Sequence, residues 1–267
     1  MRRKPYVAGQ FYPSDPGQLQ KELDRLCPQV TEKEDAIALI SPHAGYVYSG
    51  GVAGSLYAGV RLHDTCIILC PNHSGMGEKC AIMSRGSWTI PFGEIAINEH
   101  LADLIKNNSG IVAEDYSAHT YEHSLEVQLP FIYHFKDTFD FVPIALKSLS
   151  VEECRQLGMA IAKSVVEYEK DVTLVASTDM THYEPDAVAR EKDSMAIERI
   201  LQLDPQGLYT TVRDRGISMC GYIPTTVVIH GAVELGARSA NLVKYATSGE
   251  VSGDFQQVVG YAGIYLK

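Results

Sequence analysis

The sequence lacks the features that mark secreted and membrane proteins. It has 6 cysteines in 267 residues, and no two of them form a C-x-x-C pair. The longest uninterrupted apolar runs, Ala36–Ile40 and Cys66–Cys70, have the length of a strand and not of a membrane span. No apolar stretch follows the charged start of the chain, so we expect neither a signal peptide nor a transmembrane helix. Scattered cysteines without a disulfide framework indicate a reducing compartment, and we expect a cytoplasmic protein.

Positive charge is also scarce. Lysine and arginine number 23 against 33 aspartate and glutamate residues, which gives a net charge of −10. An acidic chain without a basic block is repelled by phosphate backbones and by anionic lipid surfaces. We therefore expect no nucleic-acid partner and no membrane partner.

Signature motifs of three common enzyme classes are missing. The chain contains no G-x-S-x-G nucleophile elbow, no P-loop and no G-x-G-x-x-G turn. These motifs serve serine hydrolases, nucleotide hydrolases and dinucleotide-binding enzymes, respectively. The sequence therefore gives no motif support to any of those activities.

Short apolar runs and helical patterns alternate along most of the chain. Hydrophobic residues make up 45% and charged residues 21%, as in ordinary folded proteins. Runs typical of buried strands are Ala36–Ser41, Thr65–Cys70 and Val172–Ala176. The alternation predicts an α/β fold with a mostly parallel central sheet flanked by helices. Neither a repeat nor a linker-like segment is present, so we expect a single domain over residues 1–267.

Two helices carry specific end or kink signals. The spacing predicts a helix over 150–168 that begins with a capping box, because Ser150 is followed three residues later by Glu153. The segment Glu122–Phe135 is amphipathic and is predicted to form one helix with a kink at Pro130.

Polar clusters containing a histidine follow three of the predicted strands. They contain His43, His73 and His182. A lone histidine in such a place is commonly a loop or capping residue. In open α/β sheets, however, ligands bind outside the carboxyl ends of the strands, so we predict that the three imidazoles share one site. Neutral imidazoles suit iron, copper, zinc or nickel.

Cys220 directly precedes another predicted helix, Tyr222–Leu235. A thiol near a helix N-terminus has a lowered pKa and can act as a thiolate ligand or a nucleophile. The alternative is a structural cysteine buried in the core. The position alone favours neither.

Residues 119–123 read H-x-x-E-H, the pattern of one class of zinc peptidases. That class needs a further carboxylate ligand on a later helix, and nothing in the sequence identifies one. Glu122 and Glu126 lie one helical turn apart and could equally form a solvated acidic face.

Several segments together resemble the Memo family, which includes AmmeMemoRadiSam system protein B. The resemblance runs from about residue 5 to the end of the sequence. The segments that carry it are Val7–Pro13, Pro42–Gly50, Pro71–Gly75, Glu122–Pro130, Ser177–Asp179 with His182, and Met219–Gly221.

The resemblance implies a fold similar to the class III extradiol dioxygenases of the LigB type. Those enzymes hold Fe(II) with two histidines and a carboxylate, and a further histidine acts as acid and base. Carried over to this chain, His43 and His73 are the implied imidazole ligands and His182 is the implied acid–base residue. Cys220 falls where the Memo family has a cysteine in place of the dioxygenase carboxylate. A thiolate ligand favours copper, zinc or a different iron chemistry.

The resulting hypothesis is a metal-dependent redox or oxygenase-type enzyme. His43, His73 and Cys220 would hold iron or copper, with zinc as a third option. His182, oriented by Asp179, would move protons at the substrate or at a bound oxygen species. The cleft would be lined by Asn72, Glu122 and His123.

Two other functions stay open at this point. The same cleft could capture a peptide or a protein without catalysis, or His119 and His123 could form a zinc hydrolase site. Animal relatives in the Memo family are associated with phosphopeptide binding, and prokaryotic relatives are often encoded beside a radical SAM protein. The resemblance therefore implies a small molecule or a peptide as ligand, and radical SAM system proteins as partners.

Overall fold

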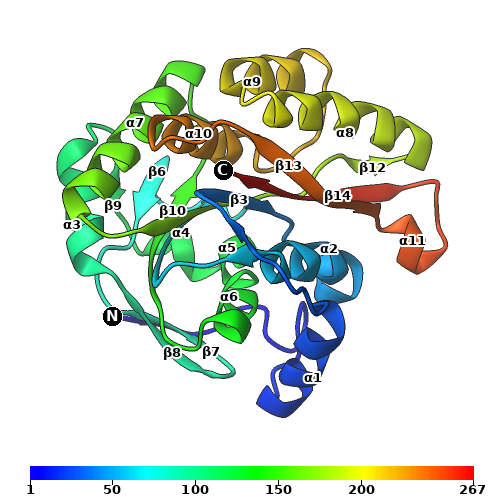
Figure 1. Ribbon diagram of the computed structural model, residues 1–267, viewed down its shortest axis with the longest axis horizontal. Helices are drawn as coiled ribbons and strands as arrows, with labels where there is room; N and C mark the ends of the chain where they lie inside the picture. The colour runs from blue at the N-terminus through cyan, green and yellow to red at the C-terminus, as the bar shows by residue number, and fades with distance from the viewer.

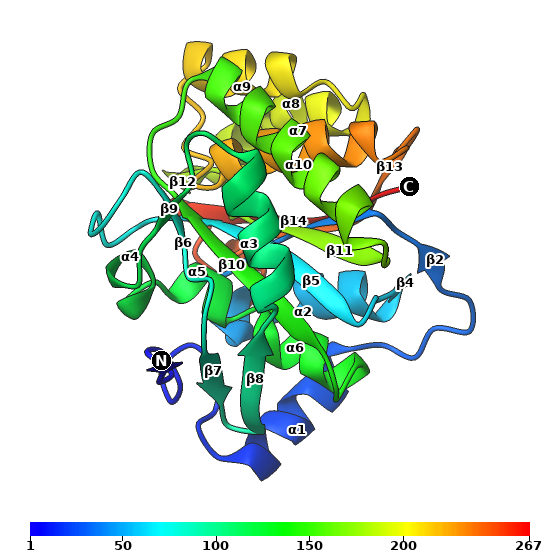
Figure 2. The ribbon, with the colours of Figure 1, turned by 90° about the vertical axis from the view of Figure 1, so that its left-hand side faces the viewer.

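The computed structural model describes residues 1–267 and has a mixed sheet of 12 strands at its centre, with helices on both faces (Figures 1 and 2). The helices are α1 (Pro16–Leu26), α2 (Tyr46–Ala58), α3 (Glu99–Asn108), α4 (Ser117–Thr120), α5 (His123–Glu126), α6 (Leu129–Phe135), α7 (Val151–Tyr168), α8 (Asp186–Leu201), α9 (Pro205–Asp214), α10 (Tyr222–Glu234) and α11 (Gly249–Ser252). The strands are β1 (Arg2–Arg3), β2 (Glu34–Asp35), β3 (Ala38–Ser41), β4 (Val60–Arg61), β5 (Thr65–Pro71), β6 (Cys80–Ile82), β7 (Ser87–Ile90), β8 (Gly93–Ile97), β9 (Ala113–Glu114), β10 (Asp140–Leu146), β11 (Val172–Ser177), β12 (His182–Glu184), β13 (Ala240–Thr247) and β14 (Val258–Leu266).

The centre of the sheet is parallel. Strands β8, β10, β5, β11 and β3 lie side by side in that order, and each neighbouring pair is parallel. Antiparallel strands flank this centre, with β7 beside β8 and β14 beside β3. The predicted α/β class with a mostly parallel central sheet is therefore confirmed.

The sheet separates two hydrophobic cores. Along β5, Ile67 and Leu69 pack into the core beneath α3, α7 and α10, whereas Cys66, Ile68 and Cys70 pack into the core beneath α1, α2 and α6. Figure 2 shows these two groups of helices on opposite sides of the sheet. Because both faces are covered, central strands such as β5 read as continuous apolar runs in the sequence.

The two helix predictions had different outcomes. The capping box is confirmed: the Ser150 hydroxyl accepts the Glu153 N–H at 3.3 Å, and the Glu153 carboxylate accepts the Ser150 N–H at 2.8 Å. The single kinked helix over Glu122–Phe135 is wrong, because the chain forms the separate helices α5 and α6. Pro130 lies in the first turn of α6, where its missing N–H costs no hydrogen bond.

The fold places several polar residues at one edge of the sheet. Strands β5, β11 and β3 are adjacent and parallel, so their carboxyl ends meet there. His43 and His73 each follow a strand end by two residues, and so does Asp179. Helix α5 is tied to the same edge, since the hydroxyl of Ser177, at the end of β11, donates to the carbonyl of Ser124 at 2.6 Å. None of the helices has the length and apolar character required to cross a membrane.

Candidate metal centre

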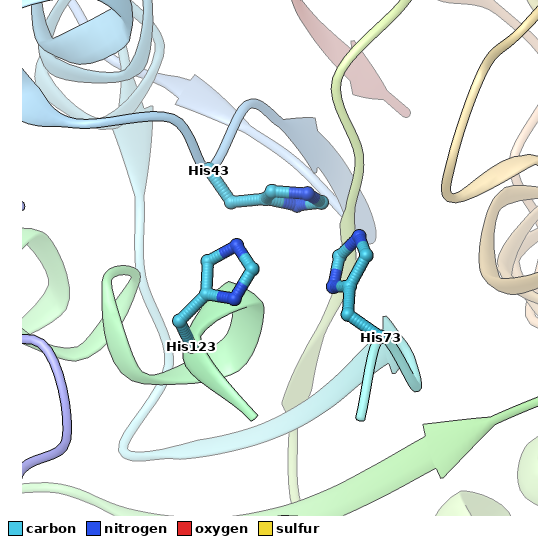
Figure 3. A group of neighbouring side chains, drawn as sticks. All are labelled: His43, His73 and His123. Carbon is cyan, nitrogen blue, oxygen red and sulfur yellow. The ribbon is translucent and has the colours of Figure 1, made fainter. Parts of the chain in front are cut away.

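Three imidazoles converge at this edge of the sheet. The side chains of His43, His73 and His123 offer ligand nitrogens that all lie within 4.8 Å of one another. Figure 3 shows the three rings turned towards a common space from a loop after β3, a loop after β5 and helix α5. Ring centroids are 5.3 Å apart for His43 and His73, and 4.7 Å apart for His73 and His123. Such a cluster could hold a metal ion.

The composition of this cluster differs from the predicted trio. The pattern of histidines after strand ends predicts His182 as the third imidazole, whereas His123 occupies that place. His123 begins a short helix and does not follow a strand, so this pattern does not identify it. Its signals are its place in the segment Glu122–Pro130 and in the H-x-x-E-H pattern, which predict only that it lines the cleft or pairs with His119.

Glu122 holds both the backbone and the ring of His73 in place. Its carboxylate accepts the backbone N–H of His73 at 2.5 Å and lies 2.9 Å from the ring nitrogen Nδ1. Burial lowers the pKa of His73, but the hydrogen bond and the charge of Glu122 outweigh it and raise that pKa. Burial raises the pKa of Glu122, but its hydrogen bonds to His73 and Ser124 have a larger and opposite effect. The net result is a pKa lowered to about 2.

This position corrects the predicted role of Glu122. The side chain is fully buried and does not line a cleft. As a carboxylate it accepts the proton on Nδ1 of His73, which leaves Nε2 of His73 with a free lone pair for a ligand.

His43 lies deeper than the other two imidazoles, at 2% exposure. Its Nδ1 is 3.0 Å from the hydroxyl of Ser177, and its Nε2 is 3.2 Å from Sγ of Cys220. Burial, followed by the neighbouring imidazole of His73, lowers the pKa of His43 well below its usual range. His43 is therefore neutral, which is the form of histidine that binds metals.

Cys220 lies beside the cluster and behaves differently from the expectation. Its Sγ accepts the backbone N–H of Asp179 at 3.3 Å. Burial and the charge of Asp179 raise the pKa of the thiol, so the predicted lowering by the start of α10 is wrong for the metal-free chain. A metal ion would displace the thiol proton on binding.

Asp179 and His182 are not paired as expected. One oxygen of Asp179 accepts the backbone N–H of His43 at 2.7 Å, and the other lies 3.9 Å from Nε2 of His43. Burial raises the pKa of Asp179 to about 6. His182 points its Nδ1 at the carbonyl oxygen of Ser218, 2.9 Å away. That carbonyl orients the imidazole, and the predicted orientation by Asp179 is wrong.

The remaining predicted residues serve local structure. The side-chain oxygen of Asn72 accepts the hydroxyl of Ser74 at 2.8 Å, and its amide donates to the carbonyl of Met76 at 2.7 Å, so Asn72 shapes the loop after His73. His119 is fully buried against Trp88 and neither ring nitrogen has a hydrogen-bond partner. His119 lies outside the imidazole cluster, so the pair required by the zinc-hydrolase hypothesis is not assembled.

A family model described as Memo-like protein matches residues 3–265. The chain belongs to the Memo family. A MEMO1 family protein of Methanopyrus kandleri is 41% identical over 281 residues, covering 100% of this chain and 99% of the relative. A second, from Methanosarcina barkeri, is 42% identical over 267 residues, covering 99% and 100%.

The fold also occurs in a solved structure of very different sequence. The crystal structure of uncharacterized protein JW3007 from Escherichia coli K12 superposes with a TM-score of 0.57 at 12% identity, covering 85% of this chain and 98% of that one. Membership of the Memo family confirms the resemblance seen in the sequence, and this likeness agrees with the fold that the resemblance implied.

Proposed function

We propose that this Memo-family protein binds one redox-active metal ion, iron or copper, and uses it in a redox or oxygenase-type reaction on a small molecule. The observation that carries the proposal is the convergence of His43, His73 and His123, whose ligand nitrogens lie within 4.8 Å of one another. The thiol of Cys220, 3.2 Å from Nε2 of His43, is the fourth donor in this proposal.

The chemistry of these donors fits a transition metal. Imidazole nitrogens and a thiolate suit iron, copper and zinc, whereas magnesium and calcium prefer oxygen ligands. Zinc bound by four protein ligands has a closed tetrahedral site, in which no position is left for a substrate. Because the proposed reaction requires such a position, we favour iron or copper over zinc. His73 has a side chain that is 35% exposed, so solvent reaches the cluster from its side.

A bound iron or copper ion would supply electron exchange with the substrate. The chain itself provides groups that hold or move protons beside it. Burial raises the pKa of Asp179, which places a carboxyl able to hold a proton 3.9 Å from Nε2 of His43. His182 donates its Nδ1 proton to the carbonyl of Ser218, which leaves Nε2 as a proton acceptor. Asp179 and His182 are therefore the acid–base residues we propose.

The cellular setting belongs to the same proposal. All six cysteines are free, which suits the reducing cytoplasm. The family resemblance further suggests radical SAM system proteins as partners.

Metal analysis of protein purified without air or chelator tests the proposal. We expect stoichiometric iron or copper in the wild type and its loss in His43→Ala and His73→Ala. His100→Ala, which changes an exposed histidine on α3, is the matched control and should retain the metal. A wild-type protein that is purified without metal and does not bind added iron, copper or zinc would contradict the proposal. The cluster would then be part of a binding surface, such as one for a peptide.

A further inference from the structure

A chain of buried hydrogen bonds connects helix α2 to the imidazole of His43. The phenol of Tyr57 donates to Oε1 of Gln128 at 3.0 Å, and Nε2 of Gln128 donates to the hydroxyl of Ser177 at 2.8 Å. The same hydroxyl lies 3.0 Å from Nδ1 of His43. Tyr57, Gln128 and Ser177 are fully buried. Each polar atom in this row of hydrogen bonds must therefore have its partner within the protein.

The contacts of Gln128 determine which way its side-chain amide faces. Its Nε2 lies 2.9 Å from the carbonyl oxygen of Pro42, and a carbonyl can only accept a hydrogen bond. The NH₂ group must therefore face Pro42. Its second hydrogen then points at the hydroxyl of Ser177, which accepts it.

The contacts of Ser177 determine where its hydroxyl proton points. Its hydroxyl donates to the carbonyl oxygen of Ser124 at 2.6 Å, and that carbonyl is again only an acceptor. Ser177 has one hydroxyl hydrogen, so it has none left for His43. The contact between Ser177 and His43 is then a hydrogen bond only if Nδ1 of His43 carries the proton.

We propose that Ser177, held in place by Gln128, is a positioning residue that keeps His43 in its Nδ1–H form. The Nε2 lone pair of His43 is thereby presented to the space shared with His73 and Cys220. The consequence for a metal rests on the proposed function, but the position of the proton is a property of the metal-free chain. Neighbours that fix the ring and tautomer of a ligating histidine commonly contribute about 10–100-fold to metal affinity.

The segment of residues 122–128 performs this task for both His43 and His73. Glu122 accepts the Nδ1 proton of His73, while the Ser124 carbonyl and the Gln128 amide orient Ser177. His123 lies within this segment and contributes its own ring. Residues 122–128 therefore contribute one imidazole and set the protonation of two others.

Nitrogen-15 NMR of the histidines in the metal-free protein tests the proposal, because it reports which ring nitrogen carries the proton. We expect Nδ1–H at His43 in the wild type. In Ser177→Ala the acceptor is lost, and we expect a shift to the Nε2–H form, in which that N–H faces Cys220. For Ser177→Ala we also expect anaerobic titration with Fe(II) to give a dissociation constant about 10–100-fold larger than that of the wild type.

Tyr57→Phe is the matched control. It removes the buried hydrogen bond from Tyr57 to Gln128. Pro42 and Ser177 still orient the Gln128 amide. The His43 proton and the Fe(II) affinity should therefore remain as in the wild type, which separates positioning from a general loss of stability.

The inference is overturned if wild-type His43 carries its proton on Nε2, or if Ser177→Ala retains both the Nδ1–H form and the wild-type affinity. The wild-type spectrum decides the first point even if the variant fails to fold. A wild type that shows Nδ1–H, changes form in Ser177→Ala and binds no metal would refute the proposed function and leave the inference standing.

Discussion

Replacing Glu122 by glutamine should strongly destabilise the protein. The carboxylate accepts four hydrogen bonds, from the N–H and Nδ1 of His73 and from the N–H and hydroxyl of Ser124. Glutamine keeps the size but has one acceptor oxygen, and its NH₂ group can only donate. Whichever way the amide turns, at least the NH₂ group and one donor facing it are left without partners. At about 1–3 kcal/mol for each buried unpaired donor, we expect a loss of about 2–6 kcal/mol.

Urea unfolding of metal-free Glu122→Gln against the wild type measures this loss. Glu191→Gln, which changes an exposed glutamate on α8, is the control and should change the free energy of unfolding by less than about 0.5 kcal/mol. A loss below about 1 kcal/mol in Glu122→Gln would show that these four bonds do not carry the stability assigned to them.

Three further predictions concern stability. Arg3→Met should cost about 3–5 kcal/mol, because the guanidinium is 1% exposed and bonds Glu126 at 2.7 Å. Urea unfolding measures that loss, and a loss below about 1 kcal/mol would contradict the reasoning. Tyr183→Gly should raise stability by up to about 1 kcal/mol, since Tyr183 has a φ of 59° and is 73% exposed; an unchanged or lower melting temperature would argue against backbone strain there. The stabilising effect of Glu122, whose folded-state pKa is lowered to about 2, should be complete above about pH 5 and disappear as the pH falls towards 2. Unfolding at a series of pH values should show this dependence in the wild type and lack it in Glu122→Gln.

The strands and their ends could be predicted because their signals are local. The apolar runs that became β3, β5 and β11 are continuous, and parallel strands expose their carboxyl ends at one edge. That reasoning placed His43 and His73 at the same edge. It could not find His123, because the position of α5 depends on tertiary contacts such as the buried ion pair between Arg3 and Glu126.

The electrostatics of the site could not be predicted for the same reason. The position of Cys220 before a helix indicated a lowered thiol pKa, but burial and Asp179 raise it. The spacing of Glu122 and Glu126 allowed a solvated acidic face, yet both side chains are fully buried. Ser177 and Gln128 stood within the segments that carry the family resemblance, although only the hydrogen-bond distances reveal what they hold.

X-ray absorption of the anaerobically purified protein at its iron or copper edge tests the central claim most directly. We predict a first shell of three imidazole nitrogens, from His43, His73 and His123, with one sulfur from Cys220. Loss of one imidazole in His123→Ala and of the sulfur in Cys220→Ser would assign the ligands. A first shell without imidazole in the wild type would contradict the account.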